Sequence, residues 1–261
     1  MIKIDLDLGG VMAMLNGVEK QARFAASKAL NATATDVRDA IKDDIRTTFD
    51  RPTPYIVNAI KVTRWARRDD LSAVVEAKYP GGKGVEPAKV LAAEIAGGRR
   101  RYKRSELLLQ RAGILPPGYY TVPGQQCPLD AYGNIKGSFV VQLVSYFQAF
   151  GEVGFKANMT AGRKAKLAKR GRSARGYAAI MGVEYFVSYG KLRGGVGSWL
   201  HPGIWARSGI HGSTVKPIIM FVPLANYRPR LKFAQRGESV ARRVFPAHFS
   251  REFAQAMRTA R

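Results

Sequence analysis

Two segments of this chain are rich in Lys and Arg, and their residue types and spacing are typical of anion binding. Each Lys or Arg that meets a phosphate releases counterions, so a run of such residues binds nucleic acid without reading its sequence. Glycine and alanine between the charges do not build a helix that reads a groove, and a solvated or protein-facing surface explains the same charges. The candidate contact residues for nucleic acid or an acidic partner are Arg99, Arg100, Arg101, Lys103 and Arg104 in the first segment, and Arg163, Lys164, Lys166, Lys169, Arg170, Arg172 and Arg175 in the second.

Catalytic chemistry has little support in the sequence. The three histidines, His201, His211 and His248, show no metal-ligand spacing, and Cys127 has no cysteine partner. The basic half of the chain has too few acids for a paired-carboxylate site or a two-metal nuclease. We therefore expect no catalytic residue, no metal and no cofactor, and we expect that the protein is not an enzyme.

The charge of the chain is large and uneven. The formal net charge of the 261 residues is +24, and the stretch from Val153 to Arg261 holds 21 basic residues against three acidic ones. A surface this positive repels its own copies unless a polyanion or an acidic protein neutralises it. The single cysteine fits a reducing compartment, and we expect neither a secretory signal nor a membrane span.

Hydrophobic periodicity predicts the elements that must position these charges. The clearest is a helix over Val18–Phe49 with an alanine-rich apolar face that ends before Pro52 and Pro54. The other expected helices are Pro87–Ile95, Ser105–Ala112, Ser138–Phe150 and a final one over Ser239–Arg261 broken at Pro246. The expected strands are Met1–Leu8, a hairpin of Ile56–Arg64 and Leu71–Ala77, and three runs over Val183–Tyr189, Ser198–Arg207 and Pro217–Leu224.

The fold class that follows is α+β. We expect a long N-terminal helix packed on a small, mostly antiparallel sheet, long loop insertions and a C-terminal amphipathic helix. Because no repeat or clean linker is visible, residues 1–261 are interpreted as a single domain with insertions at 105–150 and 156–176. The Pro- and Gly-rich stretch Gly113–Asn134 reads as a long loop.

The two ends of the chain carry a family resemblance. Near the C-terminus, Phe221-Val222-Pro223-Leu224 leads through a basic segment to Val240–Pro246 and a closing helix from His248 to Arg258. Near the N-terminus, Ala25–Ala34 combines small residues with a central Asn31. Together these segments, about a third of the chain, resemble the phage minor tail protein Z family. The stretch Ser105–Phe150 has no evident counterpart in that family.

The resemblance implies a non-enzymatic structural virion protein of a bacteriophage tail or neck, concerned with tail completion and head–tail connection. It would be assembled in the host bacterial cytoplasm as a homo-oligomeric ring of six or twelve copies around the DNA channel. Its neighbours would be portal, adaptor or tail-tube proteins, and its basic loops would make nonspecific contact with packaged DNA or with acidic neighbours. A stand-alone, sequence-nonspecific nucleic-acid-binding protein is the main alternative, and a nuclease is the weakest.

Overall fold

The chain folds into two compact units. The computed structural model describes residues 3–7, 19–78, 81, 85–147, 183–190, 200–208, 214–223 and 226–259. Unit 1 comprises Met1–Arg100 and Tyr227–Arg261, and unit 2 comprises Arg101–Asn226. Both ranges predicted as insertions, 105–150 and 156–176, fall within unit 2. Residues 101–226, which the sequence predicts as part of a single domain, contain a sheet and a hydrophobic core of their own.

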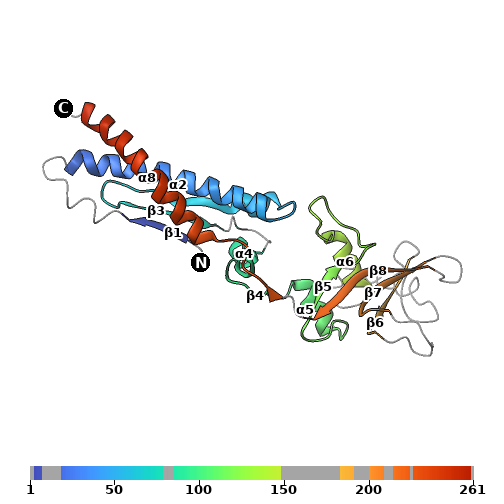
Figure 1. Ribbon diagram of the computed structural model, residues 1–261. Helices are drawn as coiled ribbons and strands as arrows, with labels where there is room; N and C mark the ends of the chain where they lie inside the picture. The colour runs from blue at the N-terminus through green and yellow to red at the C-terminus, as the bar shows by residue number, and fades with distance from the viewer. Residues whose placement is uncertain are drawn as a thin grey trace, which may run out of the picture. The chain divides into compact units, whose positions relative to one another are not determined.

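Unit 1 is built on a three-stranded antiparallel sheet in the order β1-β3-β2. The strands are β1 (Lys3–Asp7), β2 (Ile60–Arg64) and β3 (Ser72–Ala77). The long helices α2 (Glu19–Thr48) and α8 (Phe233–Arg258) cover one face of this sheet (Figure 1). Two short helices, α3 (Pro54–Ala59) and α4 (Pro87–Ala96), complete the unit.

Helix α2 confirms the strongest periodic signal of the sequence. Its buried positions recur at helical spacing and are mostly small in the first half and larger aliphatic in the second, from Ala22 to Ile45. The helix ends at Thr48, before Pro52. Pro54 is accommodated at the first turn of α3, where a missing N–H costs nothing.

Helix α8 runs antiparallel to α2. Three polar pairs show the direction, because Lys28, Asp36 and Asp44 of α2 meet Glu252, His248 and Arg236 of α8 in that order. The sequence predicted a helix from Ser239 that is broken at Pro246, but α8 begins at Phe233 and continues through this proline. Apolar side chains on both sides of Pro246 pack toward α2, and this packing holds the helix together across the lost hydrogen bond.

Unit 2 contains a four-stranded antiparallel sheet in the order β5-β8-β7-β6. The strands are β5 (Tyr119–Pro123), β6 (Glu184–Ser188), β7 (Gly203–Ser208) and β8 (Thr214–Pro223), and the helices are α5 (Arg104–Arg111) and α6 (Gly137–Tyr146). One sheet face shares a core with both helices, formed by residues such as Leu109, Leu143, Ile204 and Phe221.

Two short strands mark the places where the chain leaves unit 1 and returns to it. Strand β4 (Gly98–Arg99) pairs with β9 (Asn226–Tyr227). Gly97, just before β4, has a φ of +75°, and a Cβ there would lie 3.0 Å from Pro229 Cδ and 3.1 Å from the Tyr227 carbonyl oxygen. A side chain at this position would therefore be strained in both backbone conformation and space.

The predicted α+β class, with a long N-terminal helix, small antiparallel sheets and a C-terminal helix, is confirmed. Two further local predictions were wrong. Residues 56–59, expected in the first hairpin strand, belong to helix α3, and the expected loop Gly113–Asn134 contains strand β5.

Candidate partner-binding surfaces

The first basic segment, Arg99–Arg104, does not belong to one compact unit. Arg99 and Arg100 close the first part of unit 1, whereas Arg101, Lys103 and Arg104 open unit 2. All except Arg100 are exposed. The exposed charges of this segment are therefore divided between the two units.

In unit 2, a buried carboxylate fixes the basic residues at the start of α5. Glu106 is 0% exposed and accepts hydrogen bonds from the backbone N–H of Lys103 (2.7 Å), from the backbone N–H of Thr121 (2.8 Å) and from the Thr121 hydroxyl (2.8 Å). A buried carboxylate is tolerated only when such donors compensate its lost hydration. Glu106 therefore ties the first turn of α5 to strand β5.

An aromatic pair supports the same place. The Tyr102 ring stacks on Tyr120 of β5, with ring centroids 4.7 Å apart, and the Tyr102 hydroxyl accepts a hydrogen bond from the Gly118 N–H. Tyr102 thus turns inward between the exposed side chains of Arg101 and Lys103. Glu106 and Tyr102 therefore both fix the backbone of this segment to unit 2.

The second basic segment, from Arg163 to Arg175, lies outside the described residues, and all seven of its candidate contacts remain predictions from the sequence. The basic residues near the C-terminus are described. Several of them take carboxylate partners inside unit 1: Arg230 pairs with Glu94, Arg236 with Asp44, and Arg242 with Glu238. Some of the positive charges in the basic half therefore form ion pairs within unit 1.

Arg230 shows how such a pair is built. Its guanidinium donates two hydrogen bonds to the Glu94 carboxylate, at 2.9 and 3.0 Å, and lies 5.0 Å from the centre of the Phe49 ring. The hydrogen bond with Glu94 raises the pKa of Arg230 above its ordinary value. The Arg230 side chain therefore connects α4 to the segment that leads into α8.

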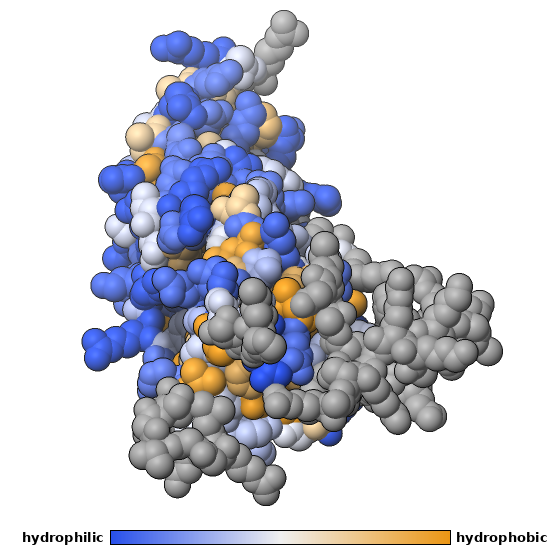
Figure 2. Space-filling view, turned by 90° about the vertical axis from the view of Figure 1, so that its right-hand side faces the viewer, coloured by the Kyte–Doolittle hydropathy of each residue, from blue (hydrophilic) through white to orange (hydrophobic). Residues whose placement is uncertain are grey.

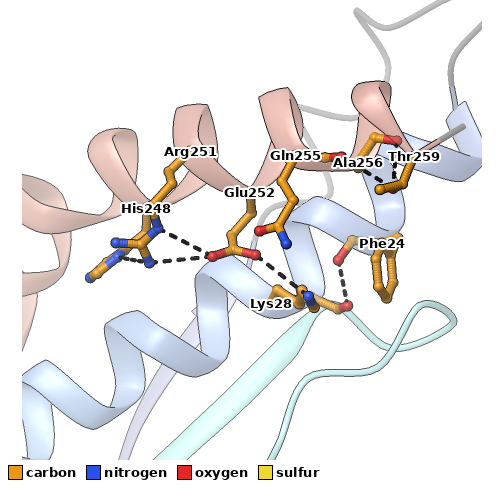
Figure 3. Close-up of polar contacts among 9 residues, drawn as sticks. Phe24, Lys28, His248, Arg251, Glu252, Gln255, Ala256 and Thr259 are labelled. Atoms are coloured by element: carbon orange, nitrogen blue, oxygen red, sulfur yellow. Dashed lines mark hydrogen bonds and ion pairs between the residues drawn. The ribbon is translucent and has the colours of Figure 1, made fainter.

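A chain of polar contacts links α2 to the last turns of α8 (Figure 3). His248 Nε2 lies 2.7 Å from Asp36 Oδ2, and Arg251 Nη2 lies 3.1 Å from His248 Nδ1. Arg251 also contacts Glu252 (3.3 Å), whose other oxygen lies 3.7 Å from Lys28 Nζ. Because Arg251 can only donate, its hydrogen bond requires His248 to accept at Nδ1. These contacts orient α8 on α2 and do not form a recognisable catalytic arrangement.

The surface, the polar groups and the helices add three observations. In the face that Figure 2 shows, hydrophilic residues dominate, with smaller hydrophobic areas among them. Among the described residues, no three His, Cys, Asp or Glu side chains are grouped so that they could hold a metal ion. None of the described helices is long and apolar enough to cross a membrane.

One exposed group was missed by the sequence analysis, which interpreted Arg67–Asp70 only as a hairpin turn. Trp65, in the connection between β2 and β3, is 48% exposed, and Arg64, Arg67 and Arg68 around it are also exposed. A tryptophan among arginines, in the sequence Arg64-Trp65-Ala66-Arg67-Arg68, was the signal that could have revealed it.

Comparison with known proteins adds no relative: no protein-family model, no curated protein and no solved structure matches this chain.

Proposed function

We propose that this chain is a non-enzymatic structural protein of a bacteriophage tail or neck. In this proposal it completes the tail or connects it to the head, and it forms a homo-oligomeric ring around the DNA channel. Its basic segments face packaged DNA or acidic neighbours such as portal, adaptor or tube subunits. It is part of the virion and is assembled in the host bacterial cytoplasm.

One observation supports this proposal above the others. The two chain ends that carry the resemblance to the phage minor tail protein Z family form helices that pack on each other. The Ala25–Ala34 segment lies in α2, and Val240–Arg258 lies in α8, with Leu30 and Ala34 sharing a core with Val240 and Ala241. These two helical parts of the resemblance, far apart in the sequence, belong to unit 1, whereas Phe221, Val222 and Pro223 lie in strand β8 of unit 2.

The first test concerns assembly. The full chain is purified, its mass is measured by light scattering, and its shape is examined by electron microscopy. We expect closed rings of six or twelve copies, alone or on addition of a cognate portal or tube protein. A heterologous contact that closes on itself produces such rings. A protein that stays monomeric in all these mixtures would contradict the proposal.

The second test concerns the basic segment. The seven Lys and Arg residues from Arg163 to Arg175 are changed to Glu in the phage that encodes the protein. We expect fewer complete particles or poorer genome retention, while circular dichroism of the isolated variant stays unchanged. A normal yield of infectious particles from this variant would contradict a DNA-facing role for the segment.

The net charge of +24 favours a second candidate, a stand-alone nucleic-acid-binding protein that does not read sequence. A soluble monomer with tight, salt-sensitive binding to RNA would support it. The two candidates differ in their first measurement, because only the structural protein is expected to form rings.

A further inference from the structure

The connection between β2 and β3 displays an aromatic side chain among cations. We call residues 64–71 the Trp65 loop. Trp65 is 48% exposed, and the neighbouring Arg64, Arg67 and Arg68 are exposed too. A large aromatic side chain that is half exposed loses much of the free energy it would gain by burial, so its place on a surface needs a reason.

The Trp65 loop is held in place by α2. The Asn31 side chain donates to the Ala66 carbonyl (3.1 Å) and accepts from the Ala66 N–H (2.7 Å), so one amide satisfies both backbone groups of this residue. The Arg67 N–H donates to the Asp70 carbonyl (2.8 Å), and Leu71 packs against Ala22 and Ala26. The backbone next to Trp65 is therefore already fixed, so binding a partner would cost little additional conformational entropy.

The three arginines of the loop differ in the groups that they contact. Arg64 lies 3.7 Å from Asp70, which also accepts a hydrogen bond from the Ser72 hydroxyl. Arg68 lies over the Phe24 ring at 4.5 Å from its centre, and Lys28 shares that ring at 5.0 Å. In the part of the chain that the structure describes, no carboxylate lies within ion-pair distance of Arg67 or Arg68. Arg67 and Arg68, two and three residues after Trp65, are thus exposed cations without a carboxylate partner among the described residues.

We propose that the Trp65 loop binds an unpaired stretch of nucleic acid. The indole of Trp65 stacks on a base, and Arg67 and Arg68 contact the flanking phosphates. Stacking on an aromatic side chain combined with a basic backbone track is how proteins hold single strands without reading sequence. The proposal goes beyond the proposed function, because it concerns an unpaired strand and not the packaged DNA around which the ring is proposed to form.

An acidic protein is the other class of partner that an exposed Trp and two Arg residues would suit. The nucleic acid is favoured because an exposed aromatic ring can stack on any base, and every linkage carries a charge that an exposed Arg can contact.

The test measures binding of a fluorescein-labelled 20-mer of thymidine to the full chain by anisotropy, at several salt concentrations. Stacking contributes about 1–3 kcal/mol per base, so we expect Trp65→Ala to weaken binding by at least about fivefold. Trp65→Phe, which keeps a π-face, should bind more tightly than Trp65→Leu, which keeps only apolar bulk. Tyr132→Ala, at another exposed aromatic, is the matched control and should bind like the parent protein.

The charges are tested separately. Changing Arg67 and Arg68 to Gln should reduce the salt dependence, since each lost phosphate contact lowers the slope for a single strand by about 0.7. Duplex DNA should show no dependence on Trp65. Thermal unfolding of each variant confirms that the exposed change leaves the fold intact.

Besides the absence of any Trp65-dependent binding, two results would overturn the inference. One is equal binding by Trp65→Leu and Trp65→Phe. The other is Trp65-dependent binding of polyglutamate with none of the oligonucleotide, which would assign the loop to an acidic protein. If rings form normally but binding does not depend on Trp65, only the inference about the Trp65 loop is contradicted. If the protein stays monomeric but its binding depends on Trp65, only the proposed ring is contradicted.

Discussion

A buried hydroxyl in α2 shows how single residues set the stability of unit 1. Thr33 is 0% exposed, and its Oγ1 has no hydrogen-bond partner in the described structure. A buried polar group without a partner costs about 1–3 kcal/mol. We expect Thr33→Val, which keeps the shape and removes the hydroxyl, to raise the free energy of unfolding by about 1 kcal/mol in urea titrations.

The matched control is two residues away. Thr35 Oγ1 donates to the Asn31 carbonyl, so Thr35→Val removes a hydrogen bond that is made and should not stabilise the protein. A loss of stability in Thr33→Val larger than in Thr35→Val would show that the Thr33 hydroxyl has a role that the structure does not reveal.

Cys127 provides a prediction about pH. Burial raises the pKa of its thiol from an ordinary value of 9.0 to about 11. The folded state therefore holds the thiol proton more tightly than the unfolded chain does. The protonated thiol makes its full contribution to the free energy of unfolding below pH 9, and this contribution is lost as the pH rises toward 11. We expect the thiol to react slowly with a disulfide reagent at pH 8 in the native protein and rapidly in urea.

A variant separates this thiol from other groups that titrate in the same range. In Cys127→Ala, the decline of the unfolding free energy between pH 9 and 11 should be shallower than in the parent protein. Fast labelling of the native protein at pH 8 would contradict the burial of Cys127.

At the scale of elements, the contact between α2 and α8 depends on small residues facing large ones. Ala22 and Ala26 meet Phe249 and Phe253, and the rings of Phe245, Phe249 and Phe253 stack at centroid distances of 5.8 and 5.7 Å. We expect Ala26→Leu to destabilise the protein by about 1–3 kcal/mol, because the added atoms have no space. Urea unfolding followed by circular dichroism measures the loss.

Ala92, exposed on α4, is the matched control: Ala92→Leu adds the same atoms where nothing blocks them and should change stability little. Equal effects of the two changes would mean that α8 is not tightly seated on the first half of α2.

The elements differ in how far the sequence predicted them. The alanine periodicity of α2 was enough to predict both the helix and a close neighbour, but not which segment that neighbour would be. Strand β5 was missed because its surroundings are rich in Pro and Gly, and it tolerates Pro123 as an edge strand. The anchoring role of Glu106 depends on Thr121, fifteen residues further along the chain, which no local pattern connects to it.

At the scale of the whole molecule, the two compact units can be tested for independence. Strands β4 and β9 pair where the chain leaves and re-enters unit 1, so a short Gly-Ser linker can replace residues 101–225. We expect the shortened protein to unfold cooperatively, because the α2–α8 contact and the first sheet are all retained. Calorimetry and circular dichroism check this result.

The control is the full chain, measured in the same buffer. Loss of cooperative unfolding in the shortened protein would mean that the two units depend on each other, as the sequence-based prediction of one domain with insertions requires.

The discontinuity of unit 1 has a consequence for its synthesis. The ribosome finishes α2 and the first sheet before it makes residues 101–226, and only afterwards does α8 emerge to cover them. At typical rates of elongation this delay lasts roughly 6–25 s. During that time the side of α2 that faces α8 has no cover, and at its end unit 2 has all of its own residues. Unit 2 therefore has the opportunity to fold first, and the completion of unit 1 must wait for the last residues to leave the exit tunnel.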